Sequence, residues 1–280
     1  MSQQKQSNFW NTPLTSSLVK GKDVKLPEML LGYFIGPVGG LLSSGIFTSI
    51  LNTYFTDVLK LDLTFLTTLQ LASTILIVIA NLVVGQLIER TRVLAGKARP
   101  WILLSALTLS VASVLMFIVP FEGVMKMVWI AIAYNLYYSV AYPIYNTANS
   151  TLVAVSTRNS DQRGQLASFT NIAGLAAMGA GSMVFPILVS FALKENQALW
   201  FVAMLAVGIL TALTVFLQYK FSRERVTEEL MESGEEEQEE DKPKAASMGT
   251  QFKAVASEKW WWVVMIFYMI FQFSGAIKNG

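Results

Sequence analysis

The sequence has 280 residues, of which 53% are hydrophobic and only 14% are charged, and its mean hydropathy is +0.48. A soluble domain carries about 25% charged residues, so we expect lipid to surround most of this chain. The lack of cysteine and histidine excludes disulfides, thiol nucleophiles, imidazole zinc ligands and histidine acid–base catalysis. The net charge of +2 is scattered between apolar stretches, so no nucleic-acid partner is expected. We expect neither an enzyme nor a cofactor or metal site.

Six apolar segments are long enough to cross a bilayer as helices, which takes roughly 17 to 25 residues. They cover residues 29–55, 64–87, 101–121, 127–152, 166–193 and 198–219. A seventh begins at Trp260 and runs to Gly280, where the apolar pattern is still unfinished, so we expect a truncated chain. The sequence therefore predicts an all-α membrane protein with a six-helix bundle and a truncated seventh transmembrane helix.

Composition also predicts the domain organisation. A polar segment, 1–26, precedes a transmembrane bundle over 27–219, and a charged linker over 220–259 leads to the seventh helix at 260–280. The linker contains an acidic run at 235–241, which cannot pack into a core and is expected to be solvated. None of the 19 acidic residues falls inside the six predicted spans.

The distribution of Lys and Arg predicts the orientation. If the N-terminus is cytoplasmic, seventeen of them lie on the cytoplasmic side and three on the other, with Lys278 left inside the seventh span. The three are Lys60, Lys126 and Lys194. We therefore expect the cell membrane as the location, with the N-terminal segment and the linker in the cytoplasm.

Small residues and prolines recur within the spans. Residues that allow close helix contact repeat every four positions in the first and fifth spans: Gly32, Gly36, Gly40, Ser44, and Ala173, Ala177, Gly181. Such stripes serve plain packing or let helices slide in a conformational cycle. Pro37, Pro143 and Pro186 lie inside spans, where neighbouring groups must satisfy the backbone atoms that proline leaves free.

The segment 85–103 is the most specific in the chain. It reads Gly-Gln-Leu-Ile-Glu-Arg-Thr-Arg-Val-Leu-Ala-Gly-Lys-Ala-Arg-Pro-Trp-Ile-Leu, closes the second span and opens the third. It resembles the loop 2–3 signature of major facilitator transporters, in the version of the glycoside–pentoside–hexuronide cation symporters, the melibiose permease group. Segments 54–59 and 156–166 resemble the same family, with Asn159 where the family usually has Asp. The resemblance implies a major-facilitator N-terminal bundle.

The two basic turns predict a conformational gate. Its members are the small or charged residues Gly85, Glu89, Arg90, Arg99, Asp161 and Arg163. A carboxylate at Glu89 can pair with a nearby Arg or face a helix N-terminus in the absent half, and breaking that contact would favour an open state. The alternative is a positively charged loop that only anchors the topology.

The resemblance also implies where a solute and a cation would bind. The family's membrane aspartates align with Leu41, Ile77, Asn81 and Asn146, and its span-five arginine aligns with Asn171. What remains near the midplane are amides and phenols suited to a polyhydroxylated solute: Asn81, Tyr142, Tyr145, Asn146, Asn149 and Asn171. Each could instead form an interhelical hydrogen bond that only holds the bundle together.

These features favour a secondary transporter that moves a small polar solute, above all a sugar or glycoside, by alternating access. Coupling to a proton or sodium ion is left open because the family's membrane aspartates are absent. The second half of the site would come from a missing C-terminal half or a second chain. The alternative function is a transporter-like membrane sensor or binding module without coupled flux.

Overall fold

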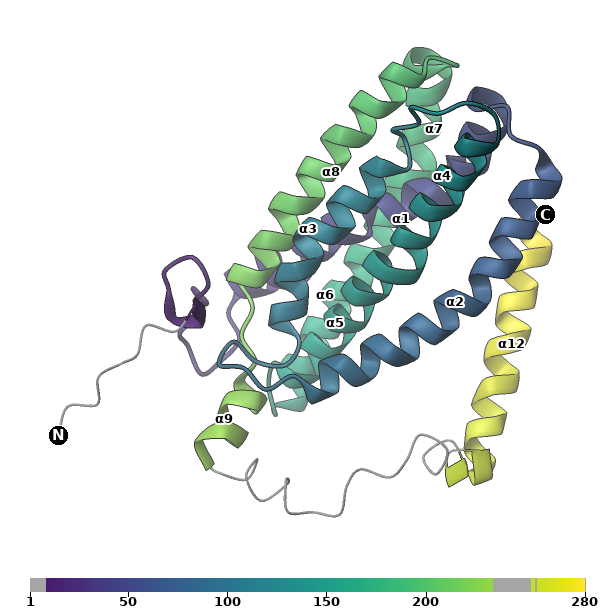
Figure 1. The fold of residues 1–280 in the computed structure, drawn as a ribbon. Coiled ribbons are helices and arrows are strands. Elements are labelled where there is room, and N and C mark those ends of the chain that lie inside the picture. The colour runs from purple at the N-terminus through teal and green to yellow at the C-terminus, as the bar shows by residue number, and fades with distance from the viewer. Residues whose placement is uncertain (1–8, 234–252, 255, 280) are drawn as a thin grey trace. The chain divides into compact units, whose positions relative to one another are not determined.

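The computed structural model describes residues 9–233, 253–254 and 256–279, and these contain helices and no strand. The predicted acidic run at 235–241 lies outside the described residues. The chain divides into two compact units, Met1–Glu229 and Leu230–Gly280. In the second unit, α12 covers Lys259–Asn279, the region of the predicted seventh helix (Figure 1).

The first unit is a bundle of long helices (Figure 1). Five are long and apolar enough to cross a membrane: Glu28–Val58, Leu63–Arg90, Gly123–Val155, Ser160–Leu193 and Gln197–Lys220. The first of these helices contains η2 (Glu28–Ile35), α1 (Gly36–Thr53) and η3 (Tyr54–Val58), and the second is α2 (Leu63–Arg90). The third contains α4 (Gly123–Asn135), η4 (Leu136–Ala141) and α5 (Tyr142–Val155). The fourth contains α6 (Ser160–Gly179), η5 (Ala180–Val184), α7 (Phe185–Leu188) and η6 (Val189–Leu193), and the fifth is α8 (Gln197–Lys220).

One predicted boundary needs correction. The third helix, α3, is apolar but covers only Arg99–Leu115, whereas the sequence predicts a span to residue 121. After Leu115 the chain tightens into turns, in which the Phe117 and Ile118 N–H groups donate to Val114 and Leu115 at 2.9 and 3.3 Å, and Pro120, which has no N–H, cannot resume the helix. The first helix begins at Glu28, one residue before the predicted span, so the helix carries an acidic residue that is 2% exposed.

A π-helical turn comes before each of the three prolines within the spans. The segments η2, η4 and η5 end just ahead of Pro37, Pro143 and Pro186. A proline ring clashes with the carbonyl four residues earlier, and a wider turn accommodates it. The first, fourth and fifth spans therefore contain irregular turns, whereas α2, α3 and α8 are continuous α-helices.

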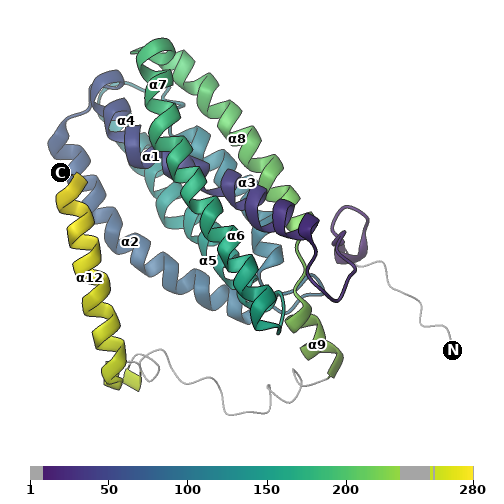
Figure 2. The same cartoon turned by 180° about the vertical axis from the view of Figure 1, so that it is seen from behind.

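The first span packs closely against three neighbours because it has glycine at the contacts. A Cβ atom at Gly36 would overlap the side chain of Gln218 in α8, and one at Gly40 would overlap the Tyr145 ring in α5. Gly45 and Gly181 bring the backbones of α1 and η5 together. From behind, α6 runs along α1 and α5 (Figure 2). The small-residue stripes thus lie at helix contacts.

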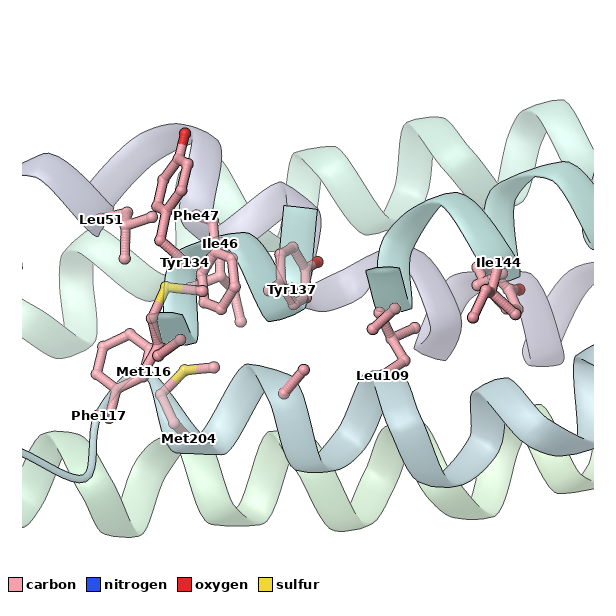
Figure 3. Packing of buried hydrophobic residues seen from close by; sticks show 14 of the residues in the cluster. Ile46, Phe47, Leu51, Leu109, Met116, Phe117, Tyr134, Tyr137, Ile144 and Met204 are labelled. Carbon is pink, nitrogen blue, oxygen red and sulfur yellow. The ribbon is translucent and has the colours of Figure 1, made fainter. Parts of the chain in front are cut away.

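Aromatic and sulfur-containing side chains fill the space between α1, η4, α3 and α8 (Figure 3). The Phe47 ring contacts Tyr137 edge-on at 4.6 Å between centroids and lies 5.9 Å from the Phe117 ring. Trp200 of α8 is fully buried and stacks on Phe117 at 6.0 Å. Helices α3 and α8 lie side by side over their length. This core sets the rotation of the helices that carry the polar residues.

We expect Gly181→Ala to destabilise the bundle by about 1–3 kcal/mol, because its methyl group would meet the backbone of Gly45 and Ile46. Thermal unfolding of the purified full-length protein measures the effect. Gly179→Ala is the matched control, since a methyl group there meets open space. Equal losses of stability in the two variants would contradict the close approach of α1 and η5.

Candidate functional site

Three of the predicted solute-binding amides lie on the exposed surface of the bundle. They are Asn81 of α2, Asn146 of α5 and Asn171 of α6. Asn81 Nδ2 donates to the Ile77 carbonyl of its own helix at 2.8 Å, while the side chains of the other two make no hydrogen bond within the described residues. An amide side chain on an apolar helix costs free energy when it faces lipid, so such side chains usually face a cavity or a hydrogen-bond partner.

The other three predicted residues are more enclosed. Tyr145 is fully buried, and its hydroxyl donates to Gln218 Oε1 at 2.9 Å. Gln218 Nε2 in turn donates to Asn149 Oδ1 at 2.7 Å, so α5 and α8 are joined by a buried polar chain. Tyr142 is half-buried, with its ring 6.0 Å from that of Tyr137. Tyr145 and Asn149 thus form interhelical hydrogen bonds, which is the alternative that the sequence left open.

The gate residues of loop 2–3 are divided between surface and interior. Glu89 has a side chain that is 75% exposed, and its carboxylate lies 3.7 Å from the Lys97 ammonium. Arg90 is exposed, and open space surrounds the position of a Cβ at Gly85. Arg99, by contrast, is 4% exposed and donates to the Ala95 and Tyr219 carbonyls at 3.2 Å each. The predicted gate is therefore not one contiguous cluster in this structure.

Loop 4–5 is ordered by Asn159, whose side-chain oxygen accepts hydrogen bonds from the backbone N–H groups of Asp161 and Gln162 at 2.9 and 3.2 Å. The residue that departs from the family pattern therefore still caps α6, as an Asp would. Asp161 and Arg163, the two predicted gate residues of this loop, have exposed side chains in the first turn of α6.

A carboxylate that the sequence analysis did not single out caps α3. Glu224 is 1% exposed and accepts hydrogen bonds from the backbone N–H groups of Lys97, Ala98 and Arg99 at 2.8 to 2.9 Å. Gly96 has a φ of +106°, and a side chain there would overlap the carboxylate. A negative charge at a helix N-terminus is favourable because it meets unpaired N–H groups and the positive end of the dipole.

The neighbouring Arg225 makes a second buried link. Its Nη1 and Nη2 donate to the two oxygens of Glu28 at 2.9 and 2.7 Å, and both side chains are less than a tenth exposed. Burial alone would lower the pKa of Arg225, but the hydrogen bonds and charge of Glu28 outweigh it and raise that pKa. The pair joins the segment after α8 to the start of the first span.

Neither Glu28, Glu224, Arg225 nor Gln218 was predicted from sequence. A usable signal was the adjacent acid and base, Glu224 and Arg225, which follow the sixth apolar span within six residues. Lys220 to Glu229, the first part of the predicted linker, thus packs against the bundle through buried residues. The described part of α9, which covers Arg225–Ser233, begins inside this contact.

The long apolar helices and the glycine-mediated packing between them define a polytopic α-helical membrane protein. Residues 32–280 match the family described as MFS/sugar transport protein. The chain belongs to this sugar-transport family of the major facilitator superfamily, and it is a multi-pass membrane protein.

Curated relatives agree in family at low identity. The chain is 23% identical to the putative glycoside/cation symporter YagG of Escherichia coli over 82% of its own length and 48% of that protein. It is 26% identical to an isoprimeverose transporter of Lactiplantibacillus pentosus, over 81% of the chain and 45% of the relative. An uncharacterized symporter of Bacillus subtilis, YjmB, is 28% identical over 62% and 38%. The chain thus spans about half the length of these relatives.

We expect Glu224→Ala to cost about 2–4 kcal/mol of stability, because three buried N–H groups lose their acceptor together with a favourable helix-dipole contact. Glu229→Ala is the control, since Glu229 pairs with exposed Arg158 at 2.8 Å and such pairs contribute about 0–1 kcal/mol. Thermal unfolding of the full-length protein compares them. A loss for Glu224→Ala no larger than that for Glu229→Ala would contradict the capping role.

Proposed function

We propose that this chain forms the N-terminal half of a secondary transporter that moves a sugar or glycoside by alternating access. The observation that carries the proposal is the exposure of Asn81, Asn146 and Asn171 on three apolar helices of the bundle. In a two-bundle transporter the solute lies between the halves near the midplane, where such amides would face it rather than lipid.

The chemistry of the exposed groups supports a carbohydrate. An amide offers both donors and an acceptor, which matches the hydroxyl groups of a sugar, and the half-buried ring of Tyr142 offers an apolar face. Two relatives bear the names glycoside/cation symporter and isoprimeverose transporter. A neutral glycoside or pentoside is therefore the solute class that we propose.

The proposed location is the cell membrane, with the N-terminal segment, loops 2–3 and 4–5 and the linker in the cytoplasm. The support is the excess of Lys and Arg on those segments, seventeen against three on the other side. A missing C-terminal half, or a second chain, would supply the facing bundle.

Coupling to a proton or sodium ion would use groups outside this half. Leu41 and Ile77 stand at two of the family's aspartate positions, and Asn81 and Asn146 at the others. Neutral amides do not take up a proton at physiological pH, and apolar side chains cannot coordinate sodium. Uptake measured with and without each ion gradient tests this assignment.

The direct test is counterflow of labelled glycosides and pentosides into proteoliposomes that contain the full-length protein. We expect saturable flux, and Asn171→Ala should reduce solute affinity about tenfold because a hydrogen bond to the solute is lost. Leu175→Ala, one turn along the exposed side of α6, removes apolar volume without a polar group and should leave affinity nearly unchanged. Saturable binding without any flux would instead favour the sensor or binding module.

For the gate, we expect Glu89→Gln to leave stability within about 0.5 kcal/mol, because the Glu89 side chain is 75% exposed and lies 3.7 Å from the Lys97 ammonium, and to shift the protein toward the inward-open state. Labelling of single cysteines placed beside residue 89 measures cytoplasmic accessibility. Glu195→Gln is the control, since the Glu195 side chain is about as exposed, at 76% against 75% for Glu89, and lies 3.6 Å from Lys60 in the loops assigned to the opposite side. Unchanged labelling after Glu89→Gln would refute the gate.

A further inference from the structure

A polar cavity of about 290 Å³ lies where the N-terminal segment, loop 2–3 and the residues after α8 meet. It is lined by Trp10, Ser16, Ser17, Val19, Lys20, Leu94, Ala95, Arg99, Arg223 and Glu228. None of these is among the exposed amides assigned to the solute. The volume is at the lower end of the range for small-molecule pockets, so it suits a compact ligand.

The lining carries an excess of positive charge, with three cations, Lys20, Arg99 and Arg223, against the single carboxylate of Glu228. That carboxylate is already committed to Arg223, at 2.7 Å from Nη2. The positive charges of Lys20 and Arg99 therefore have no partner of opposite sign at ion-pair distance within the described residues.

Arg99 distinguishes this cavity from a solvated basic surface, because its charged side chain is buried. It is 4% exposed, its outer nitrogens bond only to backbone carbonyls, its guanidinium lies 4.6 Å from the centre of the Tyr219 ring, and its Nε has no hydrogen-bond partner. The nearby Glu224 carboxylate is engaged by the N–H groups at the start of α3 and by the Thr227 hydroxyl. Glu224 and Glu228 act on Arg99 only at longer range, and a buried guanidinium without a carboxylate at ion-pair distance favours a further anion beside it.

Two further donors are available at the cavity. The Ser16 hydroxyl and the Lys20 ammonium make no hydrogen bond to any described residue, and Lys20 is exposed at the rim. An ammonium, a hydroxyl and a guanidinium together offer the charge and donors that a phosphate group binds, and a dianion would balance Lys20 and Arg99.

We propose that this cavity binds the phosphate group of a phosphomonoester, presented either by a soluble metabolite or by an anionic lipid headgroup. The bound phosphate contacts the N-terminal segment at Ser16 and Lys20 and compensates the charge of Arg99 at the start of α3. It thereby holds the N-terminal segment, loop 2–3 and the residues after α8 together. The site acts whether or not the exposed amides bind a sugar.

The first arm of the test uses inorganic phosphate and the full-length protein in phosphatidylcholine nanodiscs. Equilibrium dialysis with labelled phosphate in chloride buffer should give saturable binding of one phosphate per chain. The double variant Ser16→Ala with Lys20→Gln should weaken it about tenfold or more, since a charged hydrogen bond and a neutral one are lost. Both side chains are accessible, so the variant leaves the fold intact, and Lys22→Gln, outside the cavity, is the matched control.

The second arm separates the two sources by incorporating phosphatidic acid into the nanodiscs. If a lipid headgroup is the ligand, phosphatidic acid raises the unfolding temperature of the protein and of Lys22→Gln, but not that of the double variant. Phosphate binding that the double variant weakens supports a soluble phosphomonoester. If neither ligand has an effect, or if the double variant and Lys22→Gln respond alike, the proposal is overturned.

Discussion

The close approach of the first span to its neighbours is the constraint on which the rest of the structure depends. Without a hydrophobic driving force between helices in lipid, association relies on dispersion contacts and hydrogen bonds, which need backbones at short range. Gly36, Gly40 and Gly45 lack the side chains that would hold α8, α5 and α6 away. The hydrogen bonds between Tyr145, Gln218 and Asn149 then form deep inside the bundle, beside the same glycines. The same close helix contacts therefore provide both the packing and the hydrogen-bond partners of the buried polar side chains.

The ends of the bundle are held by charge rather than by dispersion. Glu224 ties the chain after α8 to the first turn of α3, and Arg225 ties it to Glu28 at the start of the first span. In the proposed two-bundle transporter, this segment would lead to the second bundle, and its start is anchored to loop 2–3. Movement of loop 2–3 and movement of the segment after α8 would therefore be linked through the Glu224 carboxylate.

Lipid explains why much of the fold could be predicted from sequence. In lipid each backbone N–H and C=O group must form its hydrogen bond within a helix, so a long apolar run directly predicts a membrane-spanning helix. Short basic segments between such runs predict the cytoplasmic loops. The end of α3 was predicted too late because an apolar run does not show where the chain leaves a helix, and residues 116–121 remain apolar beyond it. Burial of Glu28 and Glu224 could not be read because each depends on a partner distant in sequence.

The candidate site shows the same limit at the level of single residues. Asn146 and Asn149 look equivalent in sequence, yet Asn146 is exposed and Asn149 bonds to Gln218, because they lie on different sides of α5, which packs mainly against α3 and α2. Sequence could place amides within the apolar spans but not assign the side of the helix that each occupies. The packed bundle separates amides that join helices from amides that are exposed on its surface.

Accessibility of the exposed amides to water in the assembled transporter tests the central claim most directly. The chain has no cysteine, so single cysteines at Asn81, Asn146 and Asn171 can be labelled with a membrane-impermeant thiol reagent without background. Leu107 of α3, an exposed apolar residue, serves as the lipid-facing reference. We predict that the three cysteines react, that a transported glycoside protects them, and that the Leu107 cysteine stays unlabelled. Unreactive cysteines at all three positions would place these amides against lipid or protein and contradict the account.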